Sequence, residues 1–395
     1  MRILHVVPSF FPAVSYGGPV KALLDLCKTQ VQAGLSVRVL TSDADGKQRM
    51  RSLSHGFTQA FGVPTLYAPV RLGEDLAPSL IWHLARHLPW ADVVQISGVF
   101  SATSVLALVM ARVFRCPVVL SPHGALMPWA INSGRGRGRR TKLAALKMLS
   151  PWLSHLAGWH TASQLEADGL TLLMQQGHLP SGTPTVQVPH GVFPEDIPPL
   201  DNDWSGPAKP PTLVFLGRVH PVKRLELLVQ ALAILRHQHP EARLLIAGPV
   251  QDSAYAARLS WLIRSLDLHQ AVTFCGLVSG PQKAELLRLA SALWLCSHME
   301  SFGLVVLEAL SHGTPAVTTV QTPWACLQTE QVGHHVEAEP EALARATSPL
   351  LLLSPKQRQA LAHRCQQFVR AHFLWPDLEL RLRTFYRQTC FLHRA

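Results

Sequence analysis

Short apolar segments of strand length alternate with amphipathic helical segments along most of this 395-residue chain. In the first cycle, Ile3 to Val7 predicts a buried strand, the leucine-rich segment after Pro19 predicts a helix, and residues 36–40 predict the next strand. Gly34 marks the end of the helix between them. Because a strand–helix–strand unit of this kind joins parallel strands, the pattern predicts an α/β fold with parallel sheets.

A proline-rich segment divides the pattern into two halves. Residues 194–211 contain six prolines and almost no hydrophobic periodicity, which is typical of a linker. Further strands are expected at residues 92–96, 117–121, 159–162, 186–189, 212–216, 244–247, 272–274, 293–296 and 315–319. The predicted parts are therefore residues 1–195, residues 207–375 and a C-terminal helix over residues 376–395. Folds of this class bind ligands at the carboxyl ends of their strands, in the crevice between the halves.

The chain is basic, with 36 Lys and Arg against 25 Asp and Glu and a formal charge of +11. Such a charge favours an anionic partner: nucleic acid, an anionic membrane surface or a phosphorylated small molecule. Five of the cations lie in residues 134–142, and no aromatic residues are interleaved with them. This segment can equally be a solvated loop or a contact to membrane headgroups or phosphate. No signal peptide, membrane span or CxxC pair is evident. We expect a cytoplasmic protein. Peripheral association with the inner face of the membrane is an alternative location.

Residues 297–317 carry the most information about chemistry. A strand is expected to end just before this segment and a helix to begin within it, so that free backbone N–H groups form an anion site. Glu300 precedes the helix and Glu308 lies inside it. Carboxylates accept hydrogen bonds and so suit sugar hydroxyls better than phosphate. The nucleotide-binding positions predicted at the turn are Ser301, Phe302, Gly303 and Leu304.

Glu300 and Glu308, which are eight positions apart around Phe-Gly and before Glu-Ala-Leu, resemble the E-x7-E motif of the family 4 (group 1) retaining glycosyltransferases. Enzymes of that family have the two-domain GT-B fold. The resemblance implies that Glu308 holds the nucleotide ribose and that Glu300 approaches the donor sugar. Residues 213–223 resemble the family's strand–Gly-Arg-x-x-x-x-Lys segment, which implies that Arg218 and Lys223 bind the donor diphosphate. Since two fixed cations can stabilise a departing diphosphate, no metal is expected.

Further likenesses lie outside this region. Gly17 and Gly18 resemble a glycine-rich loop at which the backbone approaches donor phosphate. His123 resembles the family's His-Gly histidine, which contacts the transferred sugar. Residues 162–167 and 188–192 resemble its T-S-x-x-E and P-N-G-V segments. Residues 373–376 and Tyr386 resemble the C-terminal helix that crosses back to the first domain.

The chain departs from the family pattern at four positions. His190 stands where Asn is usual, and Arg224 stands where a glycine often follows the lysine. In residues 92–98, Gln95 and Ser97 replace two histidines of an Asp-x-x-His-x-His-Gly segment. These departures affect the expected contacts to the acceptor or donor sugar more than those to the diphosphate.

The sequence therefore predicts a GT-B fold, with two Rossmann-like domains whose parallel sheets face a central cleft. We expect a retaining glycosyltransferase that moves a sugar from a UDP or GDP sugar to a hydroxyl of a glycan or lipid-linked oligosaccharide in polysaccharide biosynthesis, with no cofactor and no nucleic acid partner. The predicted catalytic residues are Glu300, His123, Arg218 and Lys223. Alternatives are a nucleotide-sugar epimerase or phosphorylase-like transferase of the same fold, and a non-catalytic protein that binds nucleic acid or membrane. A dinucleotide oxidoreductase is disfavoured, because no G-x-G-x-x-G follows a strand.

Overall fold

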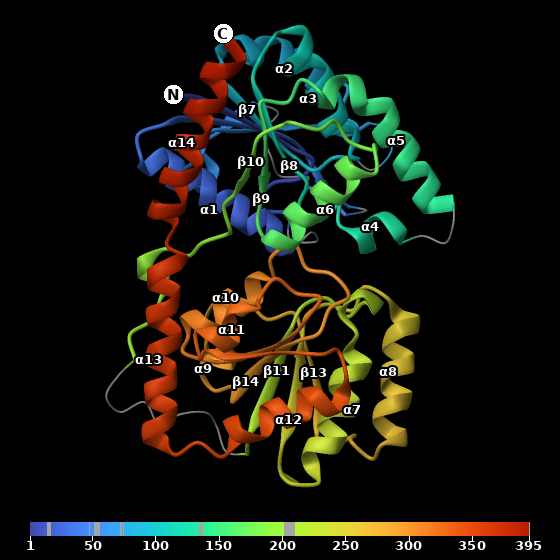
Figure 1. Cartoon of the computed structure of the whole chain (residues 1–395), viewed down its shortest axis with the longest axis vertical. Coiled ribbons are helices and arrows are strands. Elements are labelled where there is room, and N and C mark those ends of the chain that lie inside the picture. The colour runs from blue at the N-terminus through green and yellow to red at the C-terminus, as the bar shows by residue number, and fades with distance from the viewer. Residues whose placement is uncertain are drawn as a thin grey trace. The chain divides into compact units, whose positions relative to one another are not determined.

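The computed structural model describes residues 1–13, 17–46, 48–50, 56–71, 73, 75–133, 137–200 and 210–394. The chain forms two compact units: unit 1 comprises Met1–Gly191 and Trp375–Ala395, and unit 2 comprises Val192–Leu374 (Figure 1). Residues 134–136 of the predicted basic cluster and residues 201–209 of the predicted linker lie outside the described residues.

Unit 1 is built on an eight-stranded sheet of order β10-β9-β8-β7-β1-β2-β6-β5. The strands are β1 (Arg2–Val7), β2 (Ser36–Ser42), β5 (Phe57–Thr58), β6 (Thr65–Ala68), β7 (Val93–Ser97), β8 (Val118–Ser121), β9 (Gly158–Thr161) and β10 (Thr185–Gln187). All neighbours are parallel, as predicted, except the edge pair β5–β6. A separate antiparallel pair joins β3 (Ala44–Asp45) to β4 (Gln48–Arg49).

Helices cover both faces of this sheet. They are α1 (Gly18–Gln32), α2 (Leu80–His87), α3 (Ala102–Val113), α4 (Pro128–Asn132), α5 (Arg137–Leu153), α6 (Gln164–Gln175) and α14 (Trp375–Arg394). Alternate strand residues such as Leu4 and Ile96 join a buried core with α2 and α3. The intervening residues face the side on which α1 and α14 lie together (Figure 1).

Unit 2 has a six-stranded parallel sheet of order β13-β12-β11-β14-β15-β16. The strands are β11 (Thr212–Leu216), β12 (Arg243–Ala247), β13 (Val272–Gly276), β14 (Ala292–Leu295), β15 (Ala316–Thr319) and β16 (Gly333–Val336). The helices are α7 (Leu225–Arg236), α8 (Ser253–Ser265), α9 (Gly280–Arg288), α10 (Leu304–Ser311), α11 (Cys326–Thr329), α12 (Pro340–Leu351) and α13 (Pro355–His372). Short 3₁₀ turns lie at residues 60–62, 88–90, 194–196 and 221–223.

Both sheets are doubly wound. In each unit the chain builds outward from its first strand, then returns to that strand's other side, so the order reverses between β1 and β7 and between β11 and β14. This is the strand order of Rossmann-like domains, in which ligands bind at the carboxyl ends of the strands at the reversal. The predicted α/β class, with two Rossmann-like domains, is confirmed.

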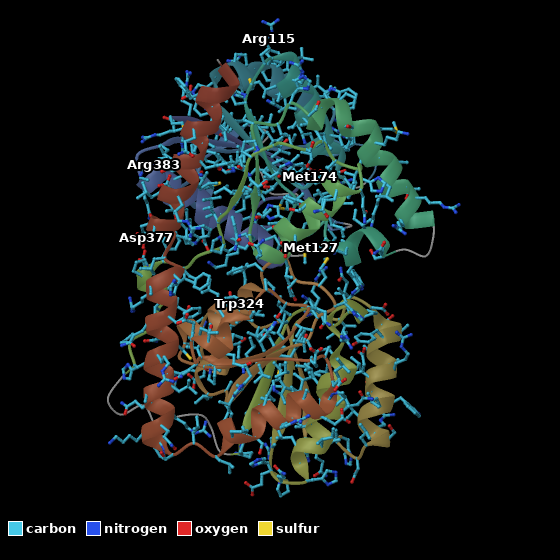
Figure 2. All side chains as sticks on the ribbon, in the orientation of Figure 1. Arg115, Met127, Met174, Trp324, Asp377 and Arg383 are labelled. Carbon is cyan, nitrogen blue, oxygen red and sulfur yellow. The ribbon has the colours of Figure 1, made fainter. Side chains whose placement is uncertain are left out.

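The C-terminal helix belongs to unit 1, as predicted. Helix α14 packs against α1 and buries Leu382 and Tyr386 completely. Arg383 of the same helix, labelled in Figure 2, is half-buried and pairs with the buried Glu379 at 3.5 Å. None of the helices within the described residues has the length and apolar character needed to cross a membrane.

Candidate functional site

The first predicted site segment of unit 2 follows β11. The backbone of Gly217 donates a hydrogen bond to the carbonyl of Ala247 at 2.9 Å, which joins the loops after β11 and β12. Gly248, at φ 146°, makes this approach possible, because an added Cβ there would lie 1.9 Å from the carbonyl oxygen of Gly217. Arg218 extends from this loop and donates from Nη1 to Gln251 at 2.8 Å. The diphosphate-binding arginine that the sequence predicts thus stands at the carboxyl end of the central strand.

Lys223 ends a 3₁₀ turn that leads directly into α7. His220 caps this turn by accepting the backbone N–H of Val222 at Nδ1. The residue after the lysine, Arg224, adopts the left-handed conformation with φ 52°. A left-handed non-glycine residue costs about 1–2 kcal/mol, which explains why glycine is usual at this position. The backbone of His298 donates to the carbonyl of Val222 at 2.8 Å, so this turn is fastened to the segment after β14.

Lys223 and Glu300 meet in a direct ion pair. Lys223 Nζ lies 2.5 Å from Glu300 Oε1, and the two side chains are 15% and 13% exposed. The hydroxyl of Ser297 donates to the same carboxylate oxygen at 2.7 Å. Partial burial strengthens such a pair relative to one in water. The structure therefore brings together the lysine predicted to bind diphosphate and the glutamate predicted to contact the donor sugar.

The predicted nucleotide-binding turn forms the start of α10. Gly303 caps the helix at φ 84°, where an added Cβ would lie 3.1 Å from Leu295 Cδ2 and 3.2 Å from Trp324 Nε1. The ring of Phe302 is buried against Trp324 and Phe373, and its carbonyl accepts the Trp324 indole N–H at 2.6 Å (Trp324 is labelled in Figure 2). The Phe302 side chain is thus part of the core that supports the turn. Ser301 and Leu304 are half-buried.

Glu308 pairs with a lysine that sequence reasoning missed. Lys283, in α9, donates from Nζ to Glu308 Oε1 at 2.6 Å, and the two side chains are 28% and 23% exposed. Nothing in the sequence distinguishes Lys283 from the other 35 basic residues, because only the fold brings α9 beside α10. In the part of the chain that the structure describes, no group of three or more His, Cys, Asp or Glu side chains is placed to hold a metal ion.

The other predicted residues lie in unit 1. Gly17 caps α1, which Gly18 begins, and an added Cβ on Gly17 would meet no atom of the described residues within 4 Å. Since Pro19 occupies the first turn, where its missing N–H costs nothing, the remaining free N–H groups are suited to an anion.

His123 sits in a tight turn after β8 that a buried carboxylate fastens. His123 and Gly124 both have positive φ, at 49° and 82°. Glu166 accepts hydrogen bonds from the backbone N–H groups of Gly124 and, at 2.8 Å, of Ala162. Burial raises the pKa of Glu166 to about 7, which these two N–H groups oppose. The T-S-x-x-E segment thus holds the His-Gly turn, a relationship that the sequence does not reveal.

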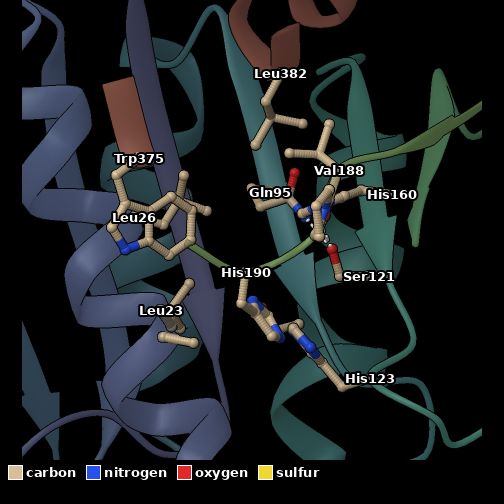
Figure 3. Close-up of a pocket in the computed structure, with 13 residues that line it drawn as sticks. Leu23, Leu26, Gln95, Ser121, His123, His160, Val188, His190, Trp375 and Leu382 are labelled. Atoms are coloured by element: carbon tan, nitrogen blue, oxygen red, sulfur yellow. Dashed lines mark hydrogen bonds between the residues drawn. The ribbon is translucent and has the colours of Figure 1, made fainter. Parts of the chain in front are cut away.

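His190 stacks on His123 (Figure 3), with ring centroids 6.2 Å apart and planes 16° apart. Burial lowers the pKa of His123 to about 4 and that of His190 well below its usual value. Both rings are therefore neutral at pH 7 and can exchange hydrogen bonds with hydroxyls without adding charge. Both rings line one small pocket of unit 1. His190 is therefore a second candidate, beside His123, for a contact to the sugar.

The two other departures from the family pattern have different surroundings. Gln95 is 1% exposed and hydrogen-bonds with Ser121 and Tyr386, so its side chain is committed to protein contacts. Ser97 lines the same pocket as His123, and its buried hydroxyl has no hydrogen-bond partner among the residues that the structure places.

Comparisons with known families agree with this arrangement. Residues 196–368 match the model of the family described as glycosyl transferases group 1. Residues 17–175 match the model described as glycosyl transferase 4-like domain. The two matches fall in unit 2 and unit 1 respectively, and together they span both groups of candidate residues.

Related proteins differ in how much of the chain they match. A D-inositol 3-phosphate glycosyltransferase of Kineococcus radiotolerans is 38% identical over 117 residues, which is 28% of this chain and 27% of that protein. Alignments with two others of this name, from Actinosynnema mirum and Jonesia denitrificans, cover 38% and 26% of those proteins, so the matched part is well under half their length. A GDP-mannose:cellobiosyl-diphosphopolyprenol alpha-mannosyltransferase of Komagataeibacter xylinus is 26% identical over 98% of this chain and 93% of that protein.

The fold has close counterparts among solved structures. The structure of Anabaena Alr3699/HepE in complex with UDP has a TM-score of 0.75 at 18% identity, covering 98% of this chain and all of that one. At this identity the likeness concerns the fold alone. Taken with the family models and the strand order of both sheets, these findings show that the chain belongs to the group 1 glycosyltransferases of the GT-B fold.

Proposed function

We propose that this protein is a retaining glycosyltransferase that transfers a sugar from a nucleoside diphosphate sugar to an acceptor hydroxyl. The observation that carries the proposal is the ion pair of Lys223 and Glu300, which lies where the chain leaves β11 and β14 at the strand-order reversal of unit 2. Ligands of doubly wound sheets bind at this place. A cation next to a carboxylate there suits a ligand that joins a diphosphate to a sugar.

The chemical step needs charge stabilisation more than a strong base. The bond between the sugar C1 and the diphosphate oxygen breaks, and the acceptor oxygen bonds to C1 on the same face. The acceptor's proton passes to the departing diphosphate oxygen, so atoms and charge balance without a protein base. Arg218 and Lys223 offset the negative charge that develops on the diphosphate, and free N–H groups at the start of α10 add to this. The step therefore requires no metal.

The carboxylates and histidines hold the substrate. Glu308 accepts hydrogen bonds from the ribose hydroxyls, with Lys283 fixing its orientation. Glu300 positions the donor sugar while paired with Lys223. His123, neutral at pH 7, contacts the sugar near the reacting carbon and, on the fastened turn, holds it in place. The glycines at the start of α1 accept donor phosphate.

The donor base is uracil or guanine and the acceptor is a glycan or lipid-linked oligosaccharide of a polysaccharide pathway. Two comparisons support this choice: the full-length relative is named for GDP-mannose and a diphosphopolyprenol acceptor, and a structural counterpart holds UDP. Exposed Arg139 and Arg140 on α5 suit contact with anionic lipid headgroups. Lys142 of the same cluster instead donates to the carbonyl of Ala130 at 2.5 Å.

A donor panel tests the proposal. Purified protein is incubated with UDP, GDP and ADP sugars plus simple glycoside acceptors, and release of nucleoside diphosphate is followed by mass spectrometry. The expected result is turnover of one UDP or GDP sugar, unaffected by EDTA, with the donor's anomeric configuration retained in the product by NMR. Isomerisation of a donor sugar in the absence of acceptor, detected by NMR without net release of nucleoside diphosphate, would point instead to an epimerase. Absence of turnover and of donor-dependent thermal stabilisation across the panel would refute the transferase.

A further inference from the structure

A row of buried polar side chains crosses four neighbouring strands of unit 1. His5 on β1, Gln95 on β7, Ser121 on β8 and His160 on β9 are each at most 6% exposed. They lie on the sheet face that α1 and α14 cover: His5 bonds Gln30 of α1 at 2.8 Å, and the remaining members connect to α14. Buried polar groups of this number are costly unless they are mutually satisfied. The row therefore has a specific hydrogen-bond order.

Four hydrogen bonds link three members of the row, Gln95, Ser121 and His160, to α14 at one end and to the loop after β10 at the other. Tyr386 Oη lies 2.8 Å from Gln95 Oε1, and Gln95 Nε2 lies 2.7 Å from Ser121 Oγ. Ser121 Oγ lies 2.9 Å from His160 Nδ1, and His160 Nε2 lies 2.9 Å from the carbonyl oxygen of Val188. Figure 3 shows Gln95, Ser121 and His160 joined in this way above His190 and His123.

The chemistry of its last acceptor fixes the direction of the whole chain. The Val188 carbonyl can only accept, so His160 carries its proton on Nε2 and, when neutral, presents a lone pair at Nδ1. Ser121 must then donate its hydroxyl proton to Nδ1 and accept from Gln95. This turns the amide oxygen of Gln95 toward the Tyr386 hydroxyl. Each side chain in the series therefore has a fixed donor and acceptor role. Loss of one donor disturbs every hydrogen bond between that donor and Val188.

The chain of hydrogen bonds ends at the carbonyl of Val188, two residues before His190. Val188 is 1% exposed, and the segment from Val188 to His190 leads directly to the ring that stacks on His123. Tyr386, at the other end, is completely buried in α14. The hydrogen bonds therefore connect the C-terminal helix to the histidine pair through the sheet.

We propose that Tyr386 and Gln95 are positioning residues for His190 and His123, acting through Ser121 and His160 on the backbone of Val188. The inference rests on the proposed function in one respect: it takes His123 as a contact of the transferred sugar. Gln95 then replaces a family histidine with a side chain that both donates and accepts in a fixed direction. The ionisable groups that face His160 are His5, His123 and His190.

Removing the first donor gives the simplest test. Tyr386→Phe leaves the ring and removes only the hydroxyl, which donates to the Gln95 amide and also interacts with the Gln30 side chain. We expect kcat to fall about tenfold with little change in the donor KM, because misplacing a group that contacts the transition state affects the chemical step. Thr389→Val is the matched control: it removes a buried α14 hydroxyl that, among the described residues, bonds only the carbonyls of Phe385 and Tyr386. It is expected to keep wild-type kcat. Equal kcat in both variants would overturn the proposal.

Gln95→Glu tests the direction of the chain through a pH profile. When protonated, the introduced carboxyl group can donate to Ser121 as the amide does, whereas the carboxylate can only accept. The ratio of variant to wild-type kcat is therefore expected to fall between pH 6 and pH 9. A ratio that stays constant over this range contradicts a directional chain, because a merely structural defect does not depend on this proton.

Nitrogen-15 NMR of histidine-labelled protein provides a readout independent of turnover. In the wild type, His160 is expected to be neutral with its proton on Nε2 at pH 7, and its resonances should move in Tyr386→Phe but not in Thr389→Val. A proton on Nδ1, or unmoved resonances in Tyr386→Phe, overturns the chain even if the enzyme is active. Conversely, the expected spectra in a protein that turns over no donor would leave the hydrogen-bond chain standing and refute its link to catalysis together with the transferase.

Discussion

Lys223 Nζ lies 2.5 Å from Glu300 Oε1 in unit 2, although 77 positions separate the two residues in the chain. A second donor, the Ser297 hydroxyl, holds the same carboxylate oxygen. One cation therefore faces both the carboxylate proposed to contact the sugar and the place proposed for the diphosphate. Because the bond that breaks in the reaction joins these two parts of the donor, Lys223 is the residue whose loss should affect catalysis most.

Lys223→Met is expected to lower kcat/KM for the donor by about 10²–10³, since removing one preorganised donor from a developing oxyanion has this effect. Steady-state kinetics with the donor found in the panel would measure it. Arg288→Met removes a cation from an exposed ion pair with Glu285 in the same unit and serves as the control, with kcat/KM within about twofold of wild type. Similar losses in both variants would show that Lys223 acts only through net charge.

Lys283→Met is expected to raise the donor KM several-fold and leave kcat unchanged. The lysine holds Glu308 Oε1 at 2.6 Å, so its loss frees the carboxylate proposed to bind the ribose without touching the reacting atoms. Glu308→Gln should raise KM further, by about tenfold, because a charged acceptor for two hydroxyls is lost. If Lys283→Met instead lowers kcat with KM constant, Lys283 contacts the diphosphate in the transition state.

Arg224→Gly is expected to give a more stable protein than Arg224→Ala by about 0.5–1 kcal/mol. Both variants remove the same side chain, but only glycine adopts φ 52° without steric cost, and this gain exceeds its larger entropy loss on folding. Urea unfolding would measure the difference in unfolding free energy, provided that the two variants have the same m-value (the slope of free energy against urea concentration). Arg258 lies in the exposed middle of α8. There the order of stability should reverse, so that Arg258→Ala is more stable than Arg258→Gly. The same order at both positions would contradict the account of Arg224.

Glu166→Gln is expected to remove a pH dependence of stability. Burial raises the pKa of Glu166 from 4.5 to about 7, so between these values the folded state binds more protons than the unfolded state, and stability falls as pH rises. The contribution has a slope of at most about 1.4 kcal/mol per pH unit and is flat above pH 7. His5, His123 and His160, whose pKa burial lowers to about 4, act in the opposite direction below pH 6.5.

The measurement is therefore the difference in unfolding free energy between wild type and Glu166→Gln from pH 5 to pH 8, in which the histidine contributions cancel. Ser163→Ala is the control, because its hydroxyl caps α6 by accepting the Glu166 backbone N–H without titrating. It should lower stability by about 1 kcal/mol equally at every pH. If the difference in unfolding free energy between wild type and Glu166→Gln does not change with pH, Glu166 is ionised throughout this range.

Much of the fold could be predicted because strand and helix periodicity is strong in this chain. The expected strand at 212–216 has the observed bounds of β11, and the other expected strands lie within two residues of theirs. Five strands were missed: β6, β16 and the two-residue strands β3, β4 and β5. β16 (Gly333–Val336) contains two histidines in four residues, and β6 (Thr65–Ala68) follows a proline, so neither shows the apolar run of a buried strand. The antiparallel edge strand β5 is too short to show a pattern.

The site was harder to predict than the fold. Motif order indicated Arg218, Lys223, Glu300 and Glu308, whose roles stay predictions. It could not indicate which side chains pair, because Lys223–Glu300 and Lys283–Glu308 each join segments of different elements. The partners of Gln95 were equally hidden, since Tyr386 lies 291 positions away. Pairing of this kind depends on tertiary packing, for which a single sequence carries no periodic signal.

The central claim is that unit 2 binds a nucleoside diphosphate through Lys223. Titration calorimetry of UDP, GDP and ADP against wild type, Lys223→Met and Arg288→Met tests it most directly. The account predicts that UDP or GDP binds the wild type with a Kd between about 1 μM and 1 mM, that Lys223→Met weakens this binding at least about tenfold, and that Arg288→Met leaves it unchanged. Binding of neither UDP nor GDP, or equal binding by wild type and Lys223→Met, would contradict it.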